Sequence, residues 1–156
     1  MSDEKWMKLA IEKGREAIAA GQTPFAAAIV RGQEVIACCH NLVWASTDIT
    51  AHGEIVTIRQ ACRILGNIDL SGCTIYSTTE PCPMCFSACH WAKLDRIVFG
   101  ASIADAQAAG FNELPISNEQ MKLAGGSPIQ LTGGVLGQEA AALFTEWRAS
   151  GRARKY

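Results

Sequence analysis

Residues 73–101 read CTIYSTTEPCPMCFSACHWAKLDRIVFGA, and this stretch decides the fold. Cys73 to Thr78 and Arg96 to Ala101 are short runs of β-forming residues, and a helical pattern opened by prolines runs between them from Pro81 to Lys93. A strand, a helix and a strand within about 30 residues form a βαβ unit. The stretch therefore predicts two parallel strands joined by a right-handed crossover helix.

The sequence before this unit predicts a helix, a hairpin and a second helix. Asp3 to Ala20 repeats apolar residues at helical spacing, and Phe25 to Val30 and Glu34 to Cys38 have the pattern of two strands joined by a short turn. From Ala51 onward, apolar residues at positions 55, 58, 62 and 65 predict a helix with one apolar face, which Gly66-Asn67 ends.

The periodic signal is weaker beyond Ala101. We expect a short helix near Asn118 to Ala124, a strand at Ile129 to Thr132 and a final helix from Gln138 to about Ala149, followed by a basic tail. Because no repeat or linker interrupts the pattern, we expect one domain over residues 1–156. The predicted fold class is a three-layer α/β/α domain with a central mixed sheet.

Length, charge and cysteine content exclude several classes of protein. The chain has 156 residues, seven cysteines and a formal net charge of −1. A chain of this length buries roughly 70% of its unfolded surface, so it needs no metal merely to fold. An odd cysteine count and the absence of a signal-peptide pattern argue against a disulfide-stapled secreted protein. The longest apolar run is too short to span a membrane, and near-neutral charge argues against a dedicated polyanion binder. We therefore expect a cytoplasmic protein.

Two short motifs carry the residues that indicate chemistry, His52-Gly53-Glu54 and Pro81-Cys82-Pro83-Met84-Cys85. Each lies at the predicted start of a helix. Cys82 and Cys85 are three residues apart, so on a helix their Cβ atoms lie about 5–6 Å apart and suit two thiolates on one zinc ion. The helix N-terminus also lowers a thiol's pKa. His52 would be the third ligand, which leaves the fourth position open to water, as in catalytic zinc sites.

Glu54 lies two residues after His52 and is better placed to carry protons than to bind the metal. A zinc ion that lowers the pKa of its water to about 7, beside such a carboxylate, makes a hydrolytic site. His-x-Glu followed by Pro-Cys-x-x-Cys is the pattern of zinc nucleobase deaminases. The two cysteines alone would also fit a redox pair or half of a structural zinc site. Cys89, one turn after Cys85, fits either a fourth ligand or a small core residue.

With these motifs the chain resembles the cytidine deaminase superfamily, and within it most closely the small bacterial guanine deaminases. The resemblance runs from about Thr23 to Ile116 and resumes at the last residues. It implies that His52, Cys82 and Cys85 bind zinc and that Glu54 shuttles the proton. The base-binding positions that it implies are Phe25 at the base pocket, Asn41 after the second strand, Trp91 in the helix after the cysteines, Glu113 in Ala109-Gly110-Phe111-Asn112-Glu113, and Tyr156 at the end of the sequence.

The resemblance also implies the reaction and the cofactor. One zinc ion per subunit, with a catalytic water, would convert guanine to xanthine and ammonia. Guanine has N–H donors on N1 and the 2-amino group, and a carboxylate at position 113 can accept hydrogen bonds from both. We therefore place Glu113 with Glu54 among the catalytic residues. The Asn41 side chain can pair with a donor and an acceptor elsewhere on the ring. We expect a homodimer, with the tail of about residues 150–156 covering the site and possible exchange of that tail between subunits. Neither a nucleic acid nor a membrane is an expected partner.

Some positions depart from that family's pattern. The family usually has Gly-Pro-Phe-Gly where this chain has Thr23-Pro24-Phe25-Ala26, and His-Ala-Glu where this chain has His52-Gly53-Glu54. Gly53, shared with fungal-type cytosine deaminases, suggests a wider pocket. Asn112 replaces the first of two acids, which leaves Glu113 alone for base recognition.

Several alternatives stay open from sequence alone. The substrate could be guanosine, cytosine, an ammeline-like triazine or adenosine in tRNA, and the basic residues near the end of the sequence favour the last. A non-catalytic, zinc-stabilised interaction domain is a further reading, although it leaves Glu54 without a role. Glu113 could be a solvated surface acid, and Tyr156 part of a frayed terminus.

Overall fold

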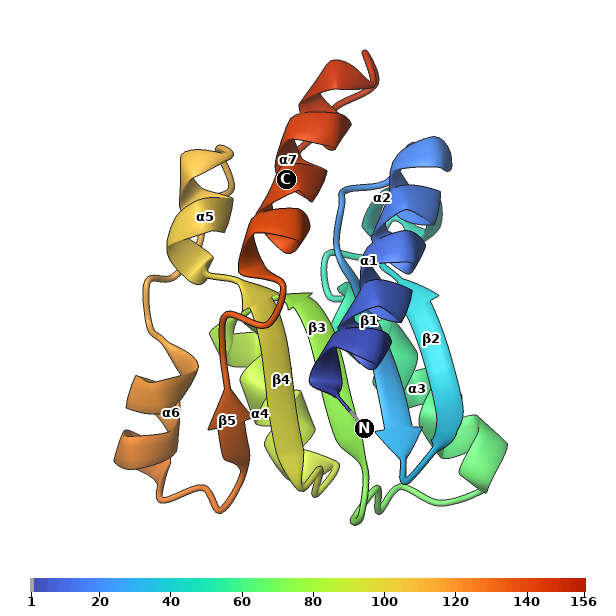
Figure 1. Ribbon diagram of the computed structural model, residues 1–156, viewed down its shortest axis with the longest axis vertical. Helices are drawn as coiled ribbons and strands as arrows, with labels where there is room; N and C mark the ends of the chain where they lie inside the picture. Colours follow the sequence, from blue (N-terminus) through green and yellow to red (C-terminus); the bar gives the residue numbers. More distant parts are fainter. Residues whose placement is uncertain (1) are drawn as a thin grey trace.

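The computed structural model describes residues 2–156, and a five-stranded mixed sheet forms its centre (Figure 1). The strand order is β2-β1-β3-β4-β5. β1 pairs antiparallel with β2 and β3, whereas β3, β4 and β5 run parallel, as predicted for the βαβ unit. The strands are β1 (Ala26–Arg31), β2 (Glu34–His40), β3 (Thr74–Thr79), β4 (Arg96–Ala101) and β5 (Gln130–Thr132).

Helices cover both faces of the sheet, which confirms the predicted three layers (Figure 1). α1 (Asp3–Ala19) and α7 (Gly137–Ala149) pack on one face, and α3 (Gly53–Leu65) and α4 (Pro83–Trp91) pack on the other. Side chains along a strand alternate between faces. In β1, Ala28 and Val30 therefore join the α1/α7 core, while Ala27 and Ile29 join the α3/α4 core.

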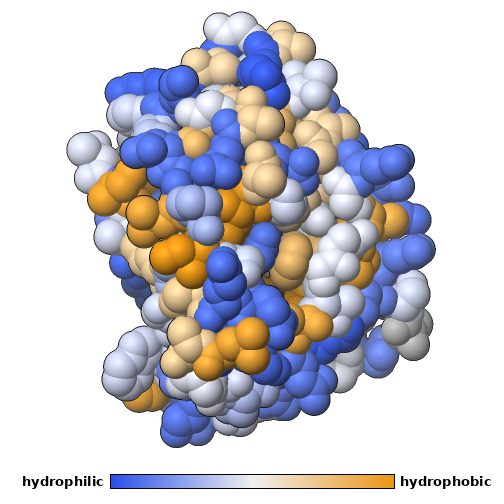
Figure 2. Space-filling view, turned by 90° about the vertical axis from the view of Figure 1, so that its left-hand side faces the viewer, coloured by the Kyte–Doolittle hydropathy of each residue, from blue (hydrophilic) through white to orange (hydrophobic). Residues whose placement is uncertain are grey.

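Two short helices were not expected from the sequence, α2 (Val43–Ser46) and α5 (Ile103–Ala108). A signal for α5 is present, because the Ser102 hydroxyl accepts from the backbone of Asp105 and the Asp105 carboxylate accepts from the backbone of Ser102, a capping box. α6 (Asn118–Gly125) lies where a helix was predicted. Figure 2 shows the side that carries α5 and α6, where hydrophobic patches alternate with hydrophilic residues.

The apolar face predicted for α3 is only partly correct. The fully buried row toward the sheet consists of Gly53, Thr57 and Ala61, whereas Ile58 and Cys62 are half-buried beside it. Small residues let the helix axis approach β1 and β2 closely, while the predicted apolar residues Ile58, Cys62 and Leu65 pack against the same core as partly buried side chains.

The topology brings the two sequence motifs together. α3 and α4 each begin beside one end of the sheet, and the residue before each first turn is His52 or Cys82. α4 follows directly on the carboxyl end of β3, the end at which α/β sheets commonly place their ligands. Among the described helices, none has the length and hydrophobicity needed to span a lipid bilayer.

Candidate active site

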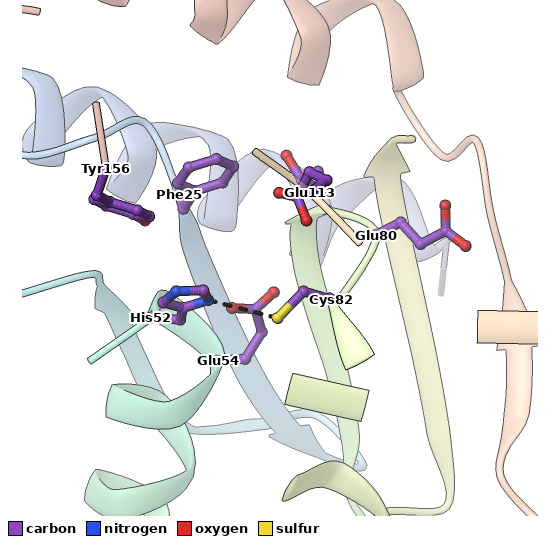
Figure 3. Close-up of a pocket in the computed structure, with 8 residues that line it drawn as sticks. Phe25, His52, Glu54, Glu80, Cys82, Glu113 and Tyr156 are labelled. Carbon is purple, nitrogen blue, oxygen red and sulfur yellow. Dashed lines mark hydrogen bonds between the residues drawn. The ribbon is translucent and has the colours of Figure 1, made fainter. Parts of the chain in front are cut away.

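Three potential metal ligands converge where α3 and α4 begin. The ligand atoms of His52, Cys82 and Cys85 all lie within 4.8 Å of one another. His52 Nδ1 is 3.7 Å from Cys82 Sγ and 3.6 Å from Cys85 Sγ (Figure 3 shows the His52–Cys82 contact). Zinc bonds of about 2.05 Å to nitrogen and 2.3 Å to sulfur, at a tetrahedral angle, would put these atoms about 3.5 Å apart. The donor set and its spacing therefore fit zinc.

Both cysteines of the cluster lie at the start of α4. Cys82 is the N-cap residue and Pro83 occupies the first turn, where its missing N–H costs nothing. A hydrogen bond with the Cys85 thiol and another with His52 outweigh burial, and lower the pKa of Cys82 to about 4. Cys82 thus favours the thiolate, the form that binds a metal.

Cys89 is not part of the metal cluster. The cluster formed by the described residues contains only His52, Cys82 and Cys85. Cys89 is fully buried in the core between α4 and the sheet. Its position supports the reading as a small core residue, and three protein ligands leave a zinc ion one open position.

Glu54 lies beneath the metal cluster and is 7% exposed. The hydroxyl of Ser77 on β3 donates a hydrogen bond of 3.0 Å to its Oε1. Burial raises the pKa of Glu54, and the nearby Cys82 thiolate raises it further. Glu54 is not in the cluster of ligand atoms, but it lines the cavity together with His52 and Cys82.

A small, partly open cavity of about 20 Å³ adjoins the cluster, and four of the predicted site residues besides the cluster meet there: Phe25, Glu54, Glu113 and Tyr156 (Figure 3). Burial raises the pKa of Glu113 to about 7, and the negative charges of Cys82 and Glu54 act in the same direction. Glu113 is half-buried and lines the cavity, so its position differs from that of a solvated surface acid. A wider groove of about 320 Å³ shares His52, Cys82, Glu113 and Tyr156 with this cavity.

The C-terminal tail lies over the site of its own chain. The Tyr156 ring stacks on His52 with 5.7 Å between ring centres, and the Thr23 hydroxyl donates to the Tyr156 oxygen at 3.2 Å. Trp44 Nε1 donates to the carbonyl of Arg154 at 2.8 Å, and the Arg154 guanidinium stacks over the Trp44 ring at 3.4 Å. Tyr156 is therefore not a frayed terminus. Within one chain the tail needs no exchange to reach the site.

Asn41 is fully buried just behind Phe25, and does not line the cavity. Its Nδ2 donates to the carbonyl of Thr23 at 2.5 Å, which holds the segment that carries Phe25. Its Oδ1 has no hydrogen-bond partner among the described residues. Contact between Asn41 and a base stays a prediction.

The prediction that Trp91 lines the base pocket is wrong for this chain. Trp91 is 82% exposed and borders a separate groove beside His90. α4 starts at the metal cluster and leads away from it, rising about 1.5 Å per residue, so its last residue ends far from the cavity. The resemblance placed an aromatic residue of this helix at the base pocket, but a position on the helix does not by itself show that the side chain reaches the cavity.

Gly53 does not widen the pocket. A Cβ at this position would lie 3.0 Å from the Cα of Ala26 and 3.1 Å from the carbonyl oxygen of Phe25, closer than side chains ordinarily approach backbone. The missing side chain instead lets the start of α3 lie directly against the start of β1. His52 and Phe25 are thereby brought close together.

The residues around the site that sequence reasoning missed include Thr23, Trp44, Ser77, Thr79 and Glu80. Trp44 lies on α2, which is too short to produce a periodic signal. Glu80 stands next to the Pro81-Cys82 motif, and this proximity is a signal that could have identified it.

Comparison with known proteins agrees with this geometry. Residues 1–101 match the cytidine and deoxycytidylate deaminase zinc-binding region. The chain is 40% identical to the guanine deaminase of Bacillus subtilis (strain 168) over 120 residues, 76% of this chain and 77% of that protein. It is 41% identical to the tRNA-specific adenosine deaminase of the same organism over 99 residues, 64% of this chain and 62% of that protein.

A solved structure of guanine deaminase from Nitrosomonas europaea superimposes with a TM-score of 0.87. The superposition covers 95% of this chain and 85% of that one, at 33% sequence identity. The sequence match over residues 1–101 includes both metal-binding motifs, and the structural match covers nearly the whole fold around them. The chain therefore belongs to the cytidine and deoxycytidylate deaminase family defined by this zinc-binding region.

Proposed function

We propose that this protein hydrolyses guanine to xanthine and ammonia. The observation that carries the proposal is the meeting of Glu54, Glu113 and the His52 metal cluster around one small cavity. The similarity to guanine deaminases in both sequence and structure supports the same substrate. The reaction consumes one water and forms a carbonyl at C2 of the ring as the amino group leaves.

Zinc supplies, when bound, the Lewis acidity that lowers the pKa of a water molecule to about 7. His52, Cys82 and Cys85 would hold one zinc ion per subunit, together with one catalytic water. The task of Glu54 is to accept a proton from the attacking water and to deliver a proton to the departing amine. A raised pKa suits this double role, because the carboxyl group must both accept and release a proton near neutral pH.

Glu113 provides the recognition that distinguishes guanine from other bases. Its carboxylate can accept hydrogen bonds from N1–H and from the 2-amino group of guanine. A base without these donors would leave the half-buried carboxylate unpaired, and this would cost binding energy. The rings of Phe25 and Tyr156 line the same cavity and supply flat apolar surfaces for the base.

Substrate entry requires the tail to move. The cavity has a volume of only about 20 Å³, which holds little more than one water molecule. A purine base fits only when Tyr156 swings away from His52, which joins the cavity to the neighbouring groove that both residues line. We therefore propose that the tail opens to admit guanine and closes over it.

The experiment that tests this function measures ammonia release from guanine, guanosine, cytosine, adenine, an ammeline-like triazine and tRNA. The Glu54→Gln variant provides the background, because it retains the metal ligands. We expect release from guanine well above this background and much lower release from cytosine and adenine. Equal rates for wild type and variant on every substrate would overturn the proposal. Metal analysis and sedimentation in the same preparation would test one zinc per subunit and the expected homodimer.

Deamination of adenosine in tRNA is the second candidate, because the chain is also 41% identical to a tRNA-specific adenosine deaminase. The basic tail, which favoured this candidate, is partly engaged within the chain. Arg154 stacks on Trp44, and Arg152 donates to the carbonyls of Ile18 and Ala19 at the end of α1. Salt-dependent tRNA binding with inosine formation would favour the second candidate, and absence of both would remove it.

A further inference from the structure

Glu80 lines the cavity, yet its carboxylate is directed away from His52 and Glu54 (Figure 3). Its Oε1 accepts from the backbone N–H of Asn118 at 3.0 Å, and its Oε2 accepts from the backbone N–H of Ile103 at 3.2 Å. Both carboxylate oxygens thus have protein partners that lie outside the reacting centre.

The two partners of Glu80 are the first residues of two helices. Ile103 begins α5 and Asn118 begins α6, where backbone N–H groups lack partners within the helix and favour a negative charge. The connection between these helices, residues 109–117, carries Glu113. One carboxylate therefore fixes both sides of the segment that presents Glu113 to the cavity.

The side chain of Asn118 links the start of α6 to the loop that carries Cys82. Its side chain is fully buried, and Nδ2 donates to the carbonyl of Pro81 at 2.6 Å. This carbonyl belongs to the peptide that joins Pro81 to Cys82. The Pro81-Cys82 loop is therefore held by Asn118 from one side, while Glu80 at its start holds the backbone of Asn118.

We propose that Glu80 and Asn118 are positioning residues that hold the metal ligand Cys82 and the recognition residue Glu113 in a fixed relation. Neither side chain belongs to the metal cluster, and Asn118 does not line the cavity. Their reciprocal contacts cross between the loop after β3 and the start of α6, so a shift of one segment moves the other. The role of Glu113 in this inference rests on the proposed function, but the role of Cys82 does not.

The first test measures the release of zinc from the zinc-loaded protein to an excess of the coloured chelator 4-(2-pyridylazo)resorcinol. The variants are Glu80→Gln, which changes charge and one acceptor at nearly constant size, and Asn118→Ala, which frees the Pro81 carbonyl. Glu119→Gln is the matched control, because Glu119 is an exposed acid in the first turn of α6. Global unfolding is followed in parallel by tryptophan fluorescence.

We expect both variants to release zinc roughly 10- to 100-fold faster than wild type, as is typical when groups behind a metal ligand are changed. Their unfolding rates should rise by a smaller factor, and cobalt(II)-substituted protein should show a shifted visible absorption spectrum. The control should match wild type in all three measurements. Wild-type release rates, or release accelerated no more than unfolding, would show that the two residues only cap helices. If Asn118→Ala fails to fold, the near-isosteric Glu80→Gln variant decides the outcome.

The second test uses guanine turnover at saturating zinc. Displacement of Glu113 should raise KM for guanine in Glu80→Gln by a larger factor than it lowers kcat. Equal, small changes in both constants would contradict the link to Glu113. If wild type does not deaminate guanine, the proposed function fails, while zinc release still decides whether the Cys82 loop is positioned in this way.

Discussion

His52, Cys82 and Cys85 stand at the starts of two helices that pack against the sheet, whereas Glu113 and Tyr156 stand on segments without regular structure. Each metal-binding motif takes its local geometry from short-range features: a helix N-terminus in both, and for the cysteines a proline in the first turn and a three-residue spacing. The base-binding side takes its geometry from contacts between segments far apart in the sequence, such as Trp44 with Arg154. The two sides should therefore respond differently to substitution.

The largest effect is expected from Glu54→Gln, which should lower the catalytic rate without changing the zinc content. Loss of a general acid–base group lowers the rate by roughly 10²- to 10⁴-fold. Because Glu54 is not one of the converging ligands, zinc content should stay at the wild-type level. Ammonia release from guanine and zinc analysis of the purified variant measure the two quantities. Loss of zinc together with activity would mean that Glu54 is part of the metal-binding side.

Glu113→Gln should damage recognition while leaving the metal in place. An amide presents a donor where guanine also presents donors, and a lost hydrogen bond to a charged group costs about 1.5–3 kcal/mol, or roughly 10- to 150-fold in kcat/KM. Steady-state kinetics with guanine measure this effect. Asn112→Ala, in the same segment but exposed at the wider groove, should lower kcat/KM far less than Glu113→Gln does. Equal losses of activity in the two variants would contradict a specific role of the Glu113 carboxylate in recognition.

Arg154→Gln tests whether the tail contributes through a specific contact. The substitution removes the stacking on Trp44, a cation–π contact of about 0.5–1 kcal/mol, so kcat/KM should fall roughly 2- to 5-fold. Arg148→Gln makes the same change of charge on an exposed position of α7 and should have no effect. Matching decreases in the two variants would point to charge rather than to the closure of Tyr156.

The last prediction concerns the pH dependence of stability and not catalysis. In the folded protein the pKa of Glu113 is raised from 4.5 to about 7, mainly by burial, so the folded state holds its proton more tightly than the unfolded state. Stability from this group is therefore lost as the pH rises from about 4.5 to 7. Relative to wild type, zinc-free Glu113→Gln should become progressively more stable over this window. Chemical denaturation of both proteins at several pH values measures the difference, and a constant difference would contradict it.

The same contrast explains what could be predicted from sequence. The βαβ unit, the three layers and the ligands His52, Cys82 and Cys85 follow from local patterns, and each lies as expected. The contacts of Trp44 with the tail and the hydrogen bond of Glu80 with the backbone of Asn118 depend on packing between distant segments, which no local pattern encodes. Trp91 was misplaced because the direction of α4 relative to the cavity is a property of the folded sheet.

Gly53 has a consequence for any redesign of this enzyme. Because the start of α3 touches the backbone of Ala26 without an intervening side chain, a methyl group at position 53 can be accommodated only if the backbone around position 26 yields. Substitutions at positions 26 and 53 therefore have to be chosen together. Libraries that vary them separately would discard combinations that are viable only together, and the cost of a substitution at one would depend on the residue at the other.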